Sequence, residues 1–216
     1  MKIIPAIIPK SYEDLESKLS LVKGLVPLVQ IDILDGIFVP EKSWPFGSEK
    51  EEIPFKQDFG FELDLMIEKP EESLDYWISL GAKRIIIHLK STSDFNEIYR
   101  KLKFNNIEVG LAVSPETTTE EITEYLEKID FIQFMGIKKI GFQGSPFDER
   151  VINKISNLRS INQDVTISVD GGVSLENAES LVQSGANRLV SGSTIFKSGD
   201  ISETIKKFEE ILNKNV

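Results

Sequence analysis

The sequence predicts an α/β protein with the (β/α)8 TIM-barrel fold, and three observations support this fold class. Short apolar segments alternate with amphipathic helical segments along the whole chain of 216 residues. The apolar segments begin about every 22 to 35 residues, which is the length of a βα unit. Eight such units, the last ending on a helix, favour a closed barrel over an open doubly wound sheet. Because a chain of this length fits one domain, we expect residues 1–216 to form a single barrel domain.

Eight apolar segments are the predicted strands. Each is rich in Ile, Val, Leu or Phe, as expected of parallel strands that are buried on both faces. The predicted strands span residues 2–8, 27–33, 60–66, 84–89, 107–112, 131–135, 165–169 and 188–191.

Seven amphipathic segments are the predicted main helices, and most follow a residue that favours a helix start. The predicted helices span residues 12–23, 71–80, 94–102, 120–128, 148–158, 175–184 and 201–212. Their start signals are Ser11, Pro70, Ser93, Thr117 or Thr118, Phe147, Ser174 and Asp200. Gly24, Gly81 and Gly185 follow three of these helices, where a left-handed glycine commonly ends a helix. Segment 40–56 contains Pro and Trp and is predicted to be a loop with at most one short helix.

The composition argues against disordered and membrane proteins. Hydrophobic residues make up 40% of the chain and charged residues 28%, a balance typical of globular domains. No apolar run approaches the roughly 20 residues that span a bilayer. The N-terminus runs directly into a strand-like segment and leaves no room for a signal peptide. We therefore expect a cytoplasmic protein that binds no membrane.

The charge and the cysteine count restrict the chemistry further. A formal net charge of −10 argues against a nucleic-acid partner, which requires a basic face. The sequence has no cysteine, so disulfides, thiol nucleophiles and thiolate metal sites are excluded. A small anionic ligand remains compatible with this charge, because backbone N–H groups can bind a phosphate without a basic patch.

Three carboxylates mark a candidate site at one end of the predicted barrel. Asp32 and Asp64 lie in the second and third strands, and Asp170 closes the seventh. In this fold the working residues come from the C-terminal ends of the strands. Each aspartate could instead cap a helix or turn, but a buried apolar strand rarely carries an unpaired carboxylate. Three at the same barrel mouth therefore indicate a site.

Glycines mark a second cluster, in the loops after the last three strands. Loops after strands seven and eight, with a short extra helix, commonly form the phosphate site of this fold. Glycine lets the backbone approach an anion closely, and residues 193–196 are predicted to start that helix. These glycines could instead serve only as turn residues. The candidate phosphate-binding residues are Gly141, Phe142, Gln143, Gly144, Gly171, Gly172, Gly192 and Ser193.

Several motifs together resemble the ribulose-phosphate 3-epimerase family. The most specific is Ile-Asp-Ile-Leu-Asp-Gly-Ile-Phe-Val-Pro at residues 31–40. Leu-Met-Ile-Glu-Lys-Pro at residues 65–70 and Val-Asp-Gly-Gly-Val at residues 169–173 also match. Gly-Ser-Thr-Ile-Phe at residues 192–196 matches as well, and the start of the chain agrees in outline. The resemblance covers essentially the whole chain and implies a barrel of the ribulose-phosphate-binding type.

The resemblance implies an isomerase that interconverts D-ribulose 5-phosphate and D-xylulose 5-phosphate in the pentose phosphate pathway. In this family two aspartates on opposite faces of the substrate move a proton at C3. The matching positions are Asp32 and Asp170. One residue removes the proton and the other returns a proton to the other face, because a single base would tend to restore the starting centre. Met66 and Met135 match the methionines that line the family's pocket, although both could equally serve as core packing.

The resemblance also implies a divalent cation, and here the sequence departs from the family. The family's ligands are a histidine and an aspartate on strand two, a histidine on strand three and an aspartate on strand seven. The matching residues are Gln30, Asp32, Asp64 and Asp170, so both histidines are absent. An all-oxygen set suits Mg²⁺ or Mn²⁺ better than Zn²⁺. We therefore expect a re-tuned site for a harder cation.

Other departures affect the residues around the predicted substrate. The first-strand serine of the family is Ala6, and the loop at residues 136–140 is longer by one residue. Lys138 or Lys139 in that loop could supply the positive charge in place of a cation. His88, the sole histidine, lies near the end of the fourth strand and is expected to form a hydrogen bond at the pocket edge.

Several functions stay open at this point. The altered residues could select another ketose phosphate, such as a ketohexose 6-phosphate. Barrels for indole or hexulose phosphate chemistry lack the motif at residues 31–40. A catalytically inactive sugar-phosphate-binding barrel is a further alternative, although a binder has no need of both Asp32 and Asp170. Related barrels often form symmetric assemblies, so a homo-oligomer is expected.

Overall fold

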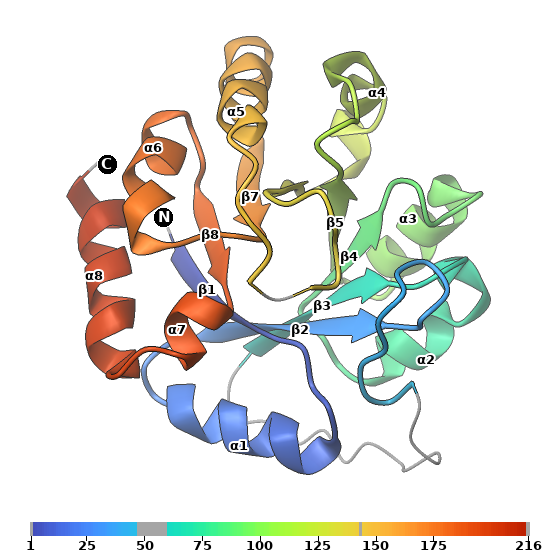
Figure 1. The fold of residues 1–216 in the computed structure, drawn as a ribbon. Coiled ribbons are helices and arrows are strands. Elements are labelled where there is room, and N and C mark those ends of the chain that lie inside the picture. Colours follow the sequence, from blue (N-terminus) through green and yellow to red (C-terminus); the bar gives the residue numbers. More distant parts are fainter. Residues whose placement is uncertain (1, 47–59, 143, 215–216) are drawn as a thin grey trace.

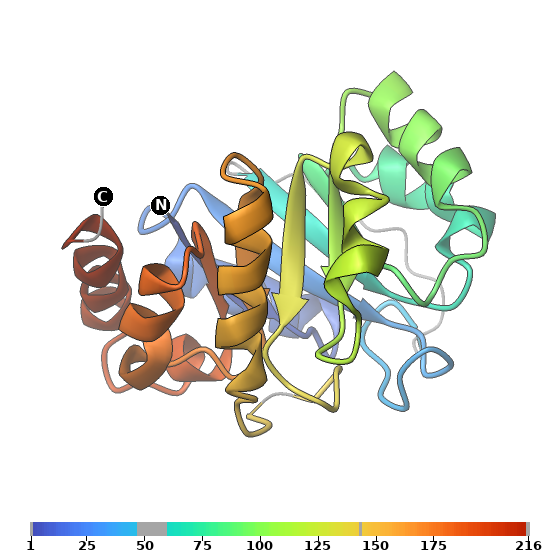
Figure 2. The ribbon, with the colours of Figure 1, turned by 90° about the horizontal axis from the view of Figure 1, so that it is seen from above.

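The chain folds into a closed parallel barrel, which confirms the predicted fold class. The computed structural model describes residues 2–46, 60–142 and 144–214. Its eight strands follow one another around the barrel in the order β1 to β8, and β8 pairs with β1. Helices surround the strands (Figure 1), and the view from above shows them standing along the outside of the sheet (Figure 2). None of the helices in these ranges is both long and apolar enough to cross a membrane.

Every predicted strand forms, and each end lies within one residue of the prediction. The agreement follows from continuous apolar runs, which parallel strands need when helices cover them on one side and the barrel core on the other. The strands are β1 Lys2–Ile7, β2 Leu28–Leu34, β3 Gly60–Met66, β4 Arg84–His88, β5 Glu108–Val113, β6 Phe131–Met135, β7 Thr166–Asp170 and β8 Arg188–Ser191.

The helices also follow the predicted order, and several signals act as expected. The α-helices are α1 Tyr12–Val22, α2 Leu74–Ser79, α3 Phe95–Phe104, α4 Thr119–Thr123, α5 Arg150–Ile161, α6 Leu175–Gln183, α7 Ser193–Phe196 and α8 Ile201–Lys214. The Ser11 hydroxyl accepts a hydrogen bond from the Asp14 N–H at 3.2 Å and caps α1. Helix α3 begins one residue later than predicted, because Asp94 rather than Ser93 is its N-cap. Thr118 caps α4. The predicted glycine ends Gly24, Gly81 and Gly185 all have positive φ, at 79°, 80° and 115°.

The prediction of one continuous helix over residues 71–80 is wrong. A 3-10 turn, η1 Pro70–Glu72, precedes α2, and the chain leaves helical geometry at Ser73, where φ is −121° and ψ is 9°. The Ser73 hydroxyl accepts a hydrogen bond at 3.0 Å from Nε1 of Trp77, a side chain that is only 1% exposed. The contact ties the buried Trp77 to the residue at which the helix is broken.

The helix predicted over residues 120–128 is likewise divided, into α4 and the 3-10 turn η2 Leu126–Lys128. The Tyr125 N–H donates to Ile122 O and the Lys128 N–H donates to Tyr125 O, at 3.0 and 2.8 Å. Both bonds span three residues, which tightens the backbone into 3-10 geometry. In the loop after β2, the described residues 40–46 form no helix, and Lys42 pairs with Asp35 in an isolated bridge. The rest of that predicted loop falls in residues 47–59, outside the described ranges.

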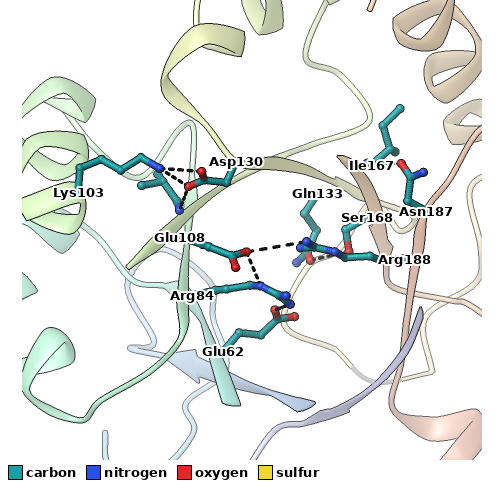
Figure 3. Close-up of polar contacts among 11 residues, drawn as sticks. Glu62, Arg84, Lys103, Glu108, Asp130, Gln133, Ile167, Ser168, Asn187 and Arg188 are labelled. Carbon is teal, nitrogen blue, oxygen red and sulfur yellow. Dashed lines mark hydrogen bonds and ion pairs between the residues drawn. The ribbon is translucent and has the colours of Figure 1, made fainter. Parts of the chain in front are cut away.

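Charged residues close the N-terminal end of the barrel interior (Figure 3). Arg84 lies between two glutamates, with Nη1 at 3.0 Å from Glu62 Oε2 and Nε at 2.6 Å from Glu108 Oε2. The Arg188 guanidinium lies 4.5 Å from the centre of the Phe131 ring. Burial raises the pKa of Glu62 to about 7, although Arg84 opposes this shift. We refer to Glu62, Arg84, Glu108, Arg188 and Phe131 as the barrel floor.

The floor depends on the absence of a side chain at Gly110. A Cβ placed there would lie 2.5 Å from Phe131 Cζ and 2.9 Å from Ile86 Cγ1. Both neighbours are fully buried and cannot move without disturbing the floor. We therefore expect Gly110→Ala to lower the free energy of unfolding in urea by about 1–3 kcal/mol. Gly199→Ala is the control, because its Cβ would meet nothing within 4 Å and should change stability by less than about 0.5 kcal/mol. Equal losses in the two variants would contradict this account of the floor.

Candidate active site

Three strands bring three carboxylates together at the C-terminal end of the barrel. Asp32 on β2 is the direct neighbour of Asp64 on β3, and Asp170 is the last residue of β7. Each offers an oxygen within 4.8 Å of the others. All three are buried, with 5%, 0% and 8% of the residue exposed, respectively. The structure therefore brings together the three aspartates that the sequence selected.

Gln30 lies directly beneath two of these carboxylates. Its Nε2 donates to Asp32 Oδ1 at 2.8 Å and to Asp170 Oδ2 at 2.7 Å. Its Oε1 is buried and has no hydrogen-bond partner. Gln30 thus bridges the two candidate catalytic residues, and it also holds an unused oxygen acceptor next to them.

Two further side chains hold Asp64. His88 Nε2 lies 3.0 Å from Asp64 Oδ1, and the His88 ring packs 5.3 Å from the ring of Phe38. Gln133 on β6 donates from Nε2 to Asp64 Oδ2 at 3.1 Å and approaches Asp170 Oδ2 at 3.5 Å. The hydrogen bond expected of His88 is present. Gln133 was not among the predicted site residues. An amide within the apolar strand Phe-Ile-Gln-Phe-Met is nevertheless as unusual as an aspartate in such a strand, and this signal could have identified it.

Burial and mutual repulsion shift the acidities of the two candidate catalytic groups. The pKa of Asp32 is raised well above its ordinary range, first by burial and then by the charges of Asp170 and Asp64. The pKa of Asp170 is raised to about 7 by burial and by Asp64, against hydrogen bonds from Gln30 and from the Gly171 backbone. Carboxyl groups this close together titrate as a coupled set rather than one by one.

A cavity opens directly above the carboxylates, and it gathers nearly all the residues predicted for substrate and phosphate. Asp32 and Asp170 line its base, and Ala6 also faces it. Gly171 and Gly172 have φ of 97° and 69°, which only glycine adopts readily. The predicted residues that line the cavity are Met66, Met135, Gly141, Phe142, Gly144, Gly171, Gly172, Gly192 and Ser193. Gln143 lies outside the described residues.

The short helix α7 begins at Ser193, directly after β8, as the sequence predicted (Figure 1). The two lysines of the preceding long loop lie elsewhere. Lys138 and Lys139 are exposed and border a separate surface hollow beside Phe147 and Asp148. The carboxylate cluster is therefore held by amides and a histidine rather than by these lysines.

The fold and the site define a (β/α)8 barrel with buried carboxylates beneath a glycine-rich cavity. Residues 2–196 match the ribulose-phosphate 3-epimerase family, and the chain belongs to that family. This membership confirms the resemblance and the predicted enzyme class, an isomerase acting on carbohydrate phosphates.

Curated relatives support the same family over most of their length. The chain is 27% identical over 214 residues to ribulose-phosphate 3-epimerase of Bacillus subtilis, covering 96% of this chain and 97% of the relative. It is 33% identical over 181 residues to the protein of that name from Chlamydia muridarum, covering 81% and 78%.

More distant solved structures share the fold. The 3-hexulose-6-phosphate synthase from Salmonella typhimurium superposes with a TM-score of 0.71 at 16% identity, covering 100% of both chains. Orotidine 5'-monophosphate decarboxylase from Sulfolobus solfataricus gives a TM-score of 0.63 at 15% identity, covering 99% of this chain and 98% of that one. At these identities the comparison shows the barrel architecture alone.

The residues at the carboxylate cluster fit a divalent cation. The convergence of the three carboxylates supplies hard, negatively charged oxygen ligands. Turning the Gln30 amide over would add its buried, unpartnered Oε1 to the same set. Because oxygen donors suit Mg²⁺ and Mn²⁺, the trio can bind such a metal.

The raised acidities predict how stability depends on pH when no cation is added. Asp170 has its pKa raised from 3.8 to about 7 on folding. Its contribution to stability is therefore fully present below about pH 4 and is lost as the pH rises through about 7. We expect the Tm of the protein in chelator to fall over this window, and to fall less in Asp170→Asn, which cannot ionise. Thermal unfolding of both proteins across the window measures this difference, and identical pH dependence would contradict it.

Proposed function

We propose that this protein interconverts D-ribulose 5-phosphate and D-xylulose 5-phosphate by proton transfer at C3 between two aspartates. The observation that carries the proposal is the pairing of Asp32 and Asp170 at the base of one cavity. Gln30 joins the two carboxylates, and burial raises both pKa values. Family membership supports the substrate class, because the curated relatives are named for this activity.

In the proposed reaction, the two aspartates exchange roles with each turnover. One carboxylate accepts the C3 proton, and the electrons of the broken C–H bond form an enediolate with its charge on the C2 oxygen. The other residue, protonated at the start, donates its proton to the opposite face of C3 and restores the carbonyl. The centre is inverted, and the pair is left ready for the reverse reaction. General acid–base steps of this kind are favoured when carboxyl groups have raised pKa values, and burial raises both pKa values here.

The phosphate of the substrate is proposed to lie against the glycine loops. Gly171 and Gly172 follow β7, and Gly192 and Ser193 follow β8 on the other side of the same cavity. Backbone N–H groups in such loops can bind an anion without a basic side chain. Gly141, Phe142 and Gly144 would close the cavity from the loop after β6, with Gln143 in the same loop.

A divalent cation, Mg²⁺ or Mn²⁺, is proposed for the carboxylate cluster. Asp32, Asp64 and Asp170 would hold it, with Oε1 of Gln30 as a fourth donor. When bound, such a cation stabilises negative charge on the enediolate oxygens. The carboxylates themselves carry the proton transfers.

A different ketose phosphate is the second candidate substrate. The observation that favours it is Ala6, which brings only a methyl group from β1 to the cavity wall. A hydroxyl of the sugar therefore finds no polar side chain at this position, and a substrate with another arrangement of hydroxyls could fit equally well. We also propose a cytoplasmic location and a homo-oligomeric assembly, as expected of this class of metabolic enzyme.

The central test replaces each proposed catalytic residue. We expect Asp32→Asn and Asp170→Asn each to lower kcat for ribulose 5-phosphate by about 10²–10⁴-fold, because each removes one proton-transfer group. Exchange of the C3 proton with solvent should fall together with turnover. Asp94→Asn is the control, because this exposed cap of α3 lies outside the cavity.

The same assay tests the cation and the alternatives. Mg²⁺ or Mn²⁺ should restore turnover after treatment with chelator, and a wild type that binds neither ion while keeping full turnover would overturn the cation site. A wild type that binds the sugar phosphate without exchanging the C3 proton would show an inactive binding protein. Parallel assays with a ketohexose 6-phosphate decide between the two substrates.

The proposed phosphate site in the glycine loops can be tested separately. Ser193→Asp would place a negative charge among the glycine loops, where it would repel the phosphate. We expect KM to rise by at least about tenfold while kcat changes little, because like charges a few Å apart repel by more than about 1.4 kcal/mol near a protein surface. Ser193→Ala, which adds no charge, should leave KM nearly unchanged. Steady-state kinetics of the two variants measure the difference, and equal KM values would place the phosphate elsewhere.

A further inference from the structure

Gln133 has a position that the proposed reaction does not yet use. It comes from the middle of β6 and is completely buried, with 0% of its surface exposed. Its Nε2 donates to Asp64 Oδ2 at 3.1 Å and approaches Asp170 Oδ2 at 3.5 Å. On its other side, Oε1 accepts a hydrogen bond from Ser168 Oγ at 3.3 Å. Figure 3 shows Gln133 and Ser168 lying beside Arg188 of the barrel floor.

The two buried amides of the site differ in what holds them. Gln30 Nε2 donates to Asp32 and Asp170, but its Oε1 has no hydrogen-bond partner. Gln133 Oε1 has a hydroxyl donor, because Ser168 is its neighbour in the strand pairing of β6 with β7. Turning the Gln133 amide over would break its N–H contacts with Asp64 and Asp170 and set its oxygen against both carboxylates, and the Ser168 hydroxyl would have to rotate to accept an N–H group. The Gln133 amide is therefore locked with its N–H groups toward Asp64 and Asp170.

The locked amide fixes the orientation of Asp64. His88 Nε2 contacts Oδ1 of this carboxylate at 3.0 Å, and Gln133 contacts Oδ2. Because each oxygen has its own partner, the carboxylate cannot rotate about its Cβ–Cγ bond without breaking both contacts. The second N–H of Gln133 points toward Asp170, which Gln30 also holds at the same oxygen.

No positive side chain shares this task in the described part of the chain. There, no Lys or Arg forms an ion pair with Asp32, Asp64 or Asp170. Their repulsion is opposed by amide N–H groups and by His88. A hydrogen-bond donor stabilises a carboxylate most when both groups are buried away from water, as Gln133 and Asp64 are.

We propose that Gln133 is a positioning residue, supported by a hydrogen bond from Ser168, that holds Asp64 in a fixed orientation beside Asp170. Gln133 does not touch the cavity and acts only through these carboxylates. Its effect on turnover rests on the proposed epimerase function, whereas its effect on the orientation of Asp64 does not.

The kinetic test uses variants of both members of the lock. Gln133→Met keeps an unbranched side chain of similar size and removes the N–H donors. We expect kcat to fall by about 10- to 100-fold, as for other residues that orient active-site ligands, while KM stays within about twofold. Ser168→Ala, which removes one hydroxyl, should lower kcat less. When it is combined with Gln133→Met, Ser168→Ala should cause no further loss of kcat, because Ser168 acts only through Gln133.

Ile132→Val is the control for lost packing on the same strand, because Ile132 packs in the core cluster outside the barrel interior. It should leave kcat and KM unchanged. A Gln133→Met enzyme with wild-type kcat, or a Ser168→Ala effect that persists fully in the double variant, would overturn the proposal.

A crystal structure of Gln133→Met separates this inference from the proposed function. We expect the Asp64 carboxylate to rotate away from its wild-type orientation, whether or not the wild type epimerises ribulose 5-phosphate. An Asp64 carboxylate that keeps its orientation without Gln133 would overturn the proposal, even in an active enzyme. A wild type without turnover would overturn only the proposed function.

Discussion

The site depends on keeping three buried carboxylates within 4.8 Å of one another. Like charges at this separation repel strongly in a poorly hydrated interior, so the cluster needs protons, hydrogen-bond donors or a cation. This chain supplies donors from three strands, through Gln30, His88 and Gln133. Burial, and then the remaining repulsion, raise the pKa values of Asp32 and Asp170, a shift that the proposed proton transfer would use. The burial and crowding that make the carboxylate cluster costly to fold are therefore also what raise its pKa values.

The carboxylates at the two ends of the barrel interior have different kinds of partner. At the floor, Glu62 and Glu108 pair directly with Arg84, and Arg188 lies against the Phe131 ring. At the opposite end the carboxylates have neutral or histidine partners. An arginine beside a carboxylate favours its charged form and opposes the rise of its pKa, as Arg84 does for Glu62, whereas amide partners bring no opposing charge. The separation places stability at one end of the strands and reactivity at the other, as is usual for this fold.

Much of the fold and part of the site follow from local sequence patterns. The strands were predictable because each is a continuous apolar run, and Asp32, Asp64 and Asp170 were conspicuous within those runs. The breaks in the helices at Ser73 and Tyr125 were not predicted, because the Trp77 contact and the 3-10 bonds found there exist only in the folded chain. Gln133 could have been noticed as a buried amide. Its partners could not, because Asp64, Asp170 and Ser168 meet it only once the barrel closes.

The closed floor has a consequence for the path of hydrogen through the enzyme. Among the described residues, Gln30, Asp64, Gln133 and Phe131 all have 0% exposure, so the underside of the cluster is dry. Asp32 and Asp170 meet water only through the cavity, which is also where a substrate would lie. A substrate bound in the cavity would therefore lie between these two carboxylates and the solvent. In the proposed reaction, the hydrogen taken from C3 would exchange with water mainly after the product leaves, and an isotopic label at C3 would measure how often it is passed on instead.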